Sequence, residues 1–136
     1  MRSKAKIGYF LTGFALLMWI SAIIEADRYE VKTVAASIYE FRDVTGNWPV
    51  SIEDLRNHTS LRMRLLPKQS WEQFIGDVVI VWPNNLSRTP DQSRNVILVY
   101  QQTGKRLWPF RWVCWGDLRT EYISTSRLNA ALASDR

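Results

Sequence analysis

The sequence has only one cysteine and one histidine among its 136 residues. A single cysteine, Cys114, excludes an intrachain disulfide, and nothing near Cys114 or His58 has the spacing of a metal site or a catalytic triad. Cys114 lies in an apolar alternating segment, which favours a buried structural thiol over a nucleophile. We therefore expect no enzymatic activity, no cofactor and no metal site.

Charged residues are absent from Ile7 to Ile24. As a helix, these roughly 18 residues would extend about 27 Å, close to the hydrocarbon thickness of about 30 Å in a bilayer. Residues 1–6 carry three cations and no acid, whereas acids follow at positions 25 and 27, so the positive-inside rule places the N-terminus in the cytoplasm. We expect a single-pass protein of the inner (cytoplasmic) membrane, with residues 7–24 in the bilayer and residues 25–136 outside the cytoplasm, in the periplasm.

A cleavable signal peptide is the alternative, because a basic segment followed by an apolar one is common to both. A signal peptidase site needs small residues at the last and third-last positions before the cut. The candidates Ile20-Ser21-Ala22 and Ile24-Glu25-Ala26 both have a large isoleucine there. The uncharged run is also longer than the 7 to 15 residues typical of a signal peptide. These features favour retention as an anchor.

Glycine and proline are absent from Phe14 to Thr45, so nothing in the sequence breaks a helix at the end of the uncharged run. Beyond it, apolar residues recur at steps of three and four, whereas the charges at positions 30, 32, 40 and 43 lie away from that stripe. This pattern predicts one helix of about 40 residues, from near Ala5 to Thr45. Gly46 can take the left-handed position that ends a helix, and Pro49 prevents its continuation.

The rest of the chain has the pattern of a short helix, four strands and a second short helix. Ser51 and Asp54 have the spacing of a capping box for a helix through Leu55. Strand-like runs occupy 77–82, 95–100, 111–115 and 119–124, and a helix capped near Ser124 or Ser126 follows. The stretch from 61 to 74 has no clear pattern.

These elements predict an α+β fold, with a long N-terminal membrane-spanning helix packed on a small antiparallel β-sheet. The helix side of the core is predicted to consist of Val31, Val34, Ile38 and Phe41. The strand residues expected opposite are Val79, Val81, Ile97, Val99 and Val113.

Two segments add a more specific pattern to this layout. The first is YEFRDVTGNWP (39–49), which leads into the helix start SIEDL, and the second is WVCWGDLRTEYIS (112–124). Together with the hydrophobic N-terminal helix, they resemble the type IV pilin and type II secretion pseudopilin family. The similarity covers about Ile7 to Leu55 and Asn95 to Leu128.

The resemblance implies a pilin-like fold and a structural role in a type II secretion or type IV pilus-like envelope machine. Its partners would be other pilin-like or secretion-system proteins and the lipid bilayer. The residues that would serve this structure are Val31, Val34, Ile38, Phe41, Gly46, Trp48, Pro49 and Asp117. An Asp in a hairpin turn usually accepts hydrogen bonds from the local backbone, and this is the role we expect for Asp117.

The sequence departs from the family at the leader. Pilins are cut after a Gly that is followed, at the fifth mature position, by a Glu that neutralises the N-terminal amine of a neighbouring subunit. Here the fifth residues after Gly8 and Gly13 are Gly13 and Met18. We therefore expect the hydrophobic segment to stay untrimmed and the protein not to form the bulk of a filament.

A basic and aromatic stretch, GKRLWPFRW (104–112), supplies a second hypothesis. Lys105, Arg106, Trp108 and Arg111 combine cations with rings that stack on bases, so the chain could be a membrane-anchored binding module for nucleic acid or another anionic polymer. The competing interpretation is a hairpin loop with solvated cations and with rings packed on the sheet. The net charge of +5 falls to +3 for residues 26–136, a modest excess that favours protein contacts.

Overall fold

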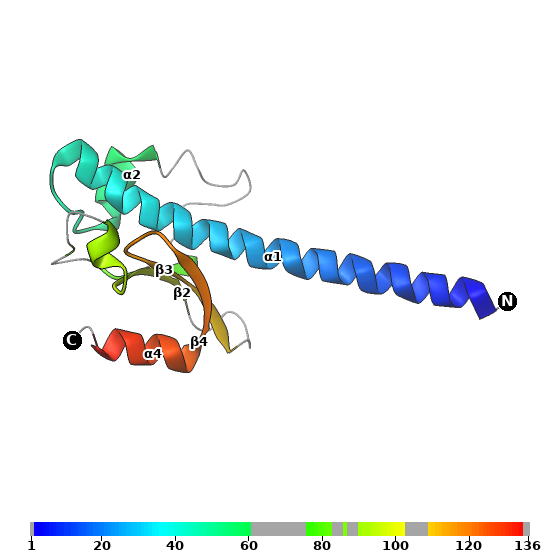
Figure 1. The fold of residues 1–136 in the computed structure, drawn as a ribbon. Coiled ribbons are helices and arrows are strands. Elements are labelled where there is room, and N and C mark those ends of the chain that lie inside the picture. The colour runs from blue at the N-terminus through cyan, green and yellow to red at the C-terminus, as the bar shows by residue number, and fades with distance from the viewer. Residues whose placement is uncertain (1, 61–75, 83–85, 87–89, 103–108, 135–136) are drawn as a thin grey trace.

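A computed structural model describes residues 2–60, 76–82, 86, 90–102 and 109–134. Helix α1, Arg2–Thr45, is a single continuous helix whose N-terminal half projects away from the rest of the protein (Figure 1). The helix ends at Gly46, which has a φ of 79° and donates its N–H to the Arg42 carbonyl at 2.7 Å. The predicted uninterrupted helix and its glycine stop are confirmed.

Helix α2, Ile52–His58, follows after a short turn. Its capping box is complete: the Ser51 hydroxyl accepts the Asp54 N–H at 3.3 Å, and the Asp54 carboxylate accepts the Ser51 N–H at 3.0 Å. The same carboxylate accepts the Val50 N–H, and these backbone donors lower the pKa of Asp54. These hydrogen bonds satisfy backbone N–H groups at the start of α2. Ser51 and Asp54, the pair predicted from their spacing in the sequence, therefore fix where the helix begins.

Within the described residues the strands form one antiparallel sheet in the order β1-β2-β3-β4. The strands are β1 (Val78–Ile80), β2 (Ile97–Gln101), β3 (Phe110–Trp115) and β4 (Thr120–Ser124). A short 3₁₀ helix, η2 (Pro90–Ser93), precedes β2 and was not foreseen from the sequence. The α+β layout, a long apolar helix with a four-stranded antiparallel sheet, agrees with the prediction.

Helix α1 packs on one face of the sheet. Val31, Val34 and Ile38 have no exposed surface, and Phe41 is 7% exposed. Their sheet-side partners in this cluster include Val78, Leu98, Val99 and Cys114. The structure therefore places the apolar stripe of α1 in the core.

Two of the strand residues expected opposite α1 lie on the other face of the sheet. Ile97 and Val113 pack with Ile123 and Leu128 in a second cluster. The cause is a β-bulge: Ile97 pairs with Trp115, but Val99 pairs with Cys114, so β2 has one extra residue there. Simple alternation places Ile97 and Val99 on the same face, and the bulge separates them.

Val81 also belongs to the second cluster, while Val78 and Ile80, rather than Val79, belong to the cluster beneath α1. The expectation for the strand side of the core was thus right for Val99 and wrong for Val79, Val81, Ile97 and Val113.

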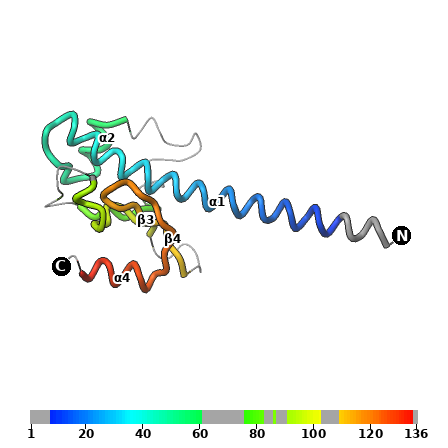
Figure 2. The backbone as a smooth tube through the Cα atoms, in the orientation of Figure 1, coloured from blue at the N-terminus to red at the C-terminus, as the bar shows by residue number. Residues whose placement is uncertain are grey.

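The second face is covered by helix α4, Thr125–Ser134, which lies across the sheet from α1 (Figure 1). The Ser124 hydroxyl accepts the Arg127 N–H at 3.3 Å, so Ser124 caps α4 as the sequence predicts. The molecule thus has three layers, in the order α1, sheet, α4 (Figure 2), and a cluster of buried side chains lies on each face of the sheet.

Two acidic residues of α1 are less solvated than their position off the apolar stripe suggests. Glu30 is buried, and the Glu40 carboxylate accepts the Ser60 N–H at 2.9 Å and the Ser60 hydroxyl at 3.0 Å. Glu40 therefore holds the end of the α2 segment against α1.

Candidate functional site

Three side chains stack where α1 ends and the following turn begins. The rings of Tyr39 and Trp48 meet edge to face, with centroids 5.5 Å apart. The guanidinium carbon of Arg42 lies 5.1 Å from the Tyr39 ring centroid and 4.9 Å from that of Trp48. A cation over two aromatic faces is attracted by both ring quadrupoles. Arg42 also pairs with Asp43, whose carboxylate lies 2.8 Å away.

Tyr39 connects this stack to the β3–β4 hairpin. Its hydroxyl donates a hydrogen bond to the carbonyl oxygen of Gly116, which lies 77 positions later in the chain. Burial raises the pKa of Tyr39, opposed in part by the cation of Arg42, so the hydroxyl keeps its proton and acts as a donor. We refer to Tyr39, Arg42, Trp48 and Gly116 as the Tyr39 junction.

Gly116 packs against η2 at a place that has no room for a side chain. A Cβ atom built at this position would overlap the backbone carbonyl and Cβ of Ser93 in η2. The Gly116 N–H donates to the Val96 carbonyl at 2.7 Å, which holds the hairpin against the segment before β2. The glycine is therefore required for packing.

The hairpin turn itself is built by its neighbours. Leu118 has a φ of 63°, and the Asp117 carboxylate accepts the Arg119 N–H at 3.1 Å. Arg94 lies 4.0 Å from the other Asp117 oxygen. Asp117 thus makes the local backbone hydrogen bond that its place in a turn suggests.

The Tyr39 junction brings together the two segments that carry the resemblance. Gly46 ends α1, Trp48 stacks on Arg42, and the side chain of Pro49 is buried. Tyr39 and Arg42 were not among the site residues predicted from the sequence. Their spacing of three on one helix face, followed by an aromatic after the glycine stop, was the signal that could have found them.

A second notable surface is the exposed apolar half of α1. The side chains from Tyr9 to Ile20 extend beyond the sheet, and most of the large ones are more than half exposed. Among the described residues, α1 is the one helix long and apolar enough to cross a membrane, and nothing in the described part of the chain covers its apolar window. A water-soluble monomer rarely exposes so large an apolar surface.

The basic and aromatic candidates are not brought together as a described surface. Lys105, Arg106 and Trp108 lie outside the described residues. Arg111 is 7% exposed, and its guanidinium donates to the Phe110 carbonyl at 2.9 Å. A buried guanidinium offers little surface to a polymer.

The described residues contain no group of three His, Cys, Asp or Glu side chains close enough to hold a metal ion. Cys114 is fully buried, and burial raises the pKa of its thiol to about 12, so it is protonated at neutral pH.

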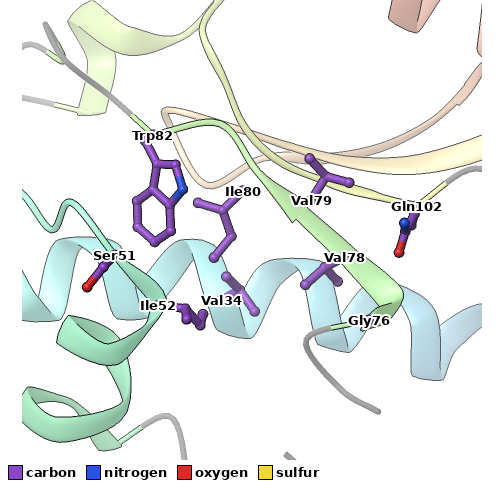
Figure 3. Close-up of a pocket in the computed structure, with 9 residues that line it drawn as sticks. All are labelled: Val34, Ser51, Ile52, Gly76, Val78, Val79, Ile80, Trp82 and Gln102. Carbon is purple, nitrogen blue, oxygen red and sulfur yellow. The ribbon is translucent and has the colours of Figure 1, made fainter. Parts of the chain in front are cut away.

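A cavity of about 520 Å³ lies between β1, α1 and α2 (Figure 3). Its walls are mainly apolar, with Val34, Ile52, Val78, Ile80 and Trp82 among them. The polar side chains that line it are Ser51, which caps α2, and Gln102. Neither is an acid, a base or an activated nucleophile.

Comparison of the chain with protein-family models, with curated proteins and with solved structures found no match.

Proposed function

We propose that this protein is a membrane-anchored, pilin-like structural component of a type II secretion or type IV pilus-like envelope machine. It acts through protein contacts and not through catalysis. Its N-terminus is cytoplasmic, α1 crosses the inner membrane, and the sheet domain lies in the periplasm.

One observation carries this proposal: a single helix has two halves with opposite surroundings. The half around Val31 to Ile38 is buried against the sheet, whereas the half from Tyr9 to Trp19 is exposed and uncharged. No glycine or proline separates them. Such a helix can hold a folded domain at a membrane surface and present its apolar half to lipid or to other apolar helices.

The Tyr39 junction gives the resemblance a physical meaning. The segment 39–49, which spans the last turns of α1 and the turn after it, and the β3–β4 hairpin both resemble pilin-like segments, and they contact each other through Tyr39 and Gly116. Pairing of these two segments supports a pilin-like domain. Arg111, the described member of the anionic-polymer set, is buried, so protein contact is the better supported mode of action.

A photo-crosslinking amino acid placed at Phe14 in the native membrane tests the proposal. Phe14 is exposed on the apolar half of α1, so we expect crosslinks to the apolar helices of other pilin-like proteins. The same substitution at Val50, which is 80% exposed on the turn before α2, is the comparison for contacts made by the domain away from the apolar half of α1. Crosslinks to lipid alone from Phe14 would contradict assembly with such proteins and leave only the anchor.

A further inference from the structure

Three aromatic residues form a cluster on the α1 face of β3 and β4. Trp112 and Tyr122 are cross-strand partners with ring centroids 5.1 Å apart, and Phe110 stacks on Tyr122 at 5.7 Å. Phe110 and Tyr122 are each 38% exposed. Along β3, the core beneath α1 includes Cys114. The exposed rings lie toward the start of β3, at the end of the sheet that this core does not cover.

Two contacts show how β3 lies along α1. Near one end, the guanidinium carbon of Arg28 lies 5.7 Å from the Trp112 ring centroid, and Arg28 donates to the Thr120 hydroxyl at 3.0 Å. Near the other end, Tyr39 donates to Gly116. The rise from Arg28 to Tyr39 is about 16 Å along the helix, and that from Trp112 to Gly116 is about 13 Å along the strand. Strand β3 therefore runs in the same direction as α1.

This direction sets the level of the aromatic cluster relative to the apolar run. Phe110 precedes Trp112 by two strand residues, about 7 Å, which corresponds to between four and five residues of helix. Counting back from Arg28 places Phe110 level with Ile24, the last residue of the uncharged run. The Gln101 amide donates to the Asp27 carboxylate at 2.9 Å, and Tyr100 pairs with Val113, so the end of β2 lies level with Trp112 and Arg28, slightly further from the apolar run than Phe110. Figure 1 shows this end of the sheet facing the projecting half of α1.

The interfacial zone of a bilayer is about 5 to 7 Å thick on each side of the hydrocarbon. If residues 7–24 occupy the hydrocarbon, Phe110 lies at its border and Trp112 and Tyr122 lie at the depth of the headgroups. Aromatic side chains, with an apolar body and for Trp and Tyr a polar tip, favour that zone.

Among the described residues, the cation that contacts the cluster is paired with an acid. Arg28 pairs with Glu25 at 3.5 Å, one turn away on α1. A surface with paired charges and exposed rings suits zwitterionic headgroups and does not need an anionic lipid.

We infer that Phe110 and Tyr122, with Trp112 behind them, form a lipid-contacting surface, which we call the seat. Through this surface the sheet domain contacts the outer headgroups of the membrane. This inference depends on the proposed anchor. It adds that the domain contacts the bilayer through a second surface and is not held away from it by α1 alone. The domain would then have a fixed tilt, with the Tyr39 junction and α2 facing away from the membrane toward partners.

Depth-dependent fluorescence quenching in phosphatidylcholine nanodiscs tests this seat. The full chain carries one cysteine, introduced as Phe110→Cys or Tyr122→Cys in a Cys114→Ala background and labelled with an environment-sensitive dye. Quenching lipids carry a nitroxide either at the headgroup or deep in the acyl chain. Phe14→Cys reports on the anchor. Val50→Cys is the matched control, because Val50 is 80% exposed and lies on the turn before α2, away from the seat.

We expect the headgroup nitroxide to quench the dye at positions 110 and 122 more than the deep nitroxide does, and neither to quench it at position 50. Native-like tryptophan fluorescence of each labelled variant establishes that it is folded. Quenching at position 14 without quenching at 110 or 122 overturns the seat and leaves the anchor intact. A dye at 110 that is shielded from water but not quenched by lipid points to a protein on this surface, and also overturns the seat. Absence of quenching at position 14 overturns the anchor, and the seat with it.

Discussion

At the scale of single residues, the hydroxyl of Tyr39 makes a long-range contact that holds α1 to the β3–β4 hairpin. It joins the last turns of α1 to a hairpin that the chain forms 77 positions later. The acceptor is the carbonyl of Gly116, a position where a Cβ atom would overlap Ser93. The hairpin therefore needs a glycine here to pack against η2.

Replacing Tyr39 with Phe removes this donor and keeps the ring that stacks on Trp48. We expect the free energy of unfolding to fall by about 1 kcal/mol, because the buried Gly116 carbonyl loses its partner. Urea unfolding in detergent micelles, followed by tryptophan fluorescence, measures the change. Tyr29→Phe is the control, since water can replace a partner of a half-exposed side chain, and an equal loss there would contradict the role given to Tyr39.

The buried thiol gives a prediction about pH. Burial raises the pKa of Cys114 from 9.0 to about 12, so the folded protein favours the neutral thiol. The unfolded chain loses this proton first. The stability linked to Cys114 is therefore complete below pH 9 and is lost as the pH rises toward 12. We expect a thiol reagent at pH 8 to react quickly with urea-unfolded protein and slowly with folded protein, and rapid labelling of the folded state would show that the thiol is accessible.

At the scale of elements, the sequence predicts what depends on local pattern and misses what depends on pairing. The continuity of α1, its stop at Gly46 and the Ser51 cap all follow from residues a few positions apart. The faces of Ile97 and Val113 do not, because a bulge in β2 arises from its pairing with β3. The contact of Tyr39 with Gly116 is likewise non-local, and no spacing in the sequence indicates it.

Two apolar residues of α1, three positions apart, test which face of the helix is buried. Phe41 is 7% exposed in the core, whereas Val44 is 68% exposed. We expect Phe41→Ala to lower the free energy of unfolding by about 3 to 5 kcal/mol and Val44→Ala to change it by less than about 0.5 kcal/mol. Urea unfolding of the two variants measures this, and similar losses would mean that the packed face of α1 is assigned wrongly. Glu40 is unsuitable as the control because its carboxylate binds Ser60.

At the scale of the whole molecule, a layered domain is joined to an apolar helix that extends beyond it. The three layers place a buried cluster on each face of the sheet, and the exposed rings of Phe110 and Tyr122 lie beyond the cluster under α1. The uncharged half of α1 has no such cover in the described structure. A bilayer supplies it in our proposal, and the Tyr39 junction keeps the domain fixed to the outer half of the helix.

The direction of crossing follows from the charges at the two ends of the apolar run. Three cations precede Ile7, and acids follow Ile24. We expect a reporter that is active only outside the cytoplasm to function when fused after Arg136. A reporter that functions only in the cytoplasm should be silent at the same position. The reverse pattern would contradict the orientation and the pilin-like proposal with it.

The central claim is that α1 stays whole, serving as membrane anchor and as part of the core. The mass of the protein recovered from its native membrane after an alkaline wash tests this most directly. We predict a full-length mass in the membrane pellet, because neither Gly8 nor Gly13 is followed by Glu at the fifth position and the signal-peptidase candidates have isoleucine where a small residue is needed. A chain beginning at Tyr9 or Phe14 would show that a prepilin-type peptidase accepts this leader, and a soluble chain lacking the apolar run would show a signal peptide. Either result would contradict the account.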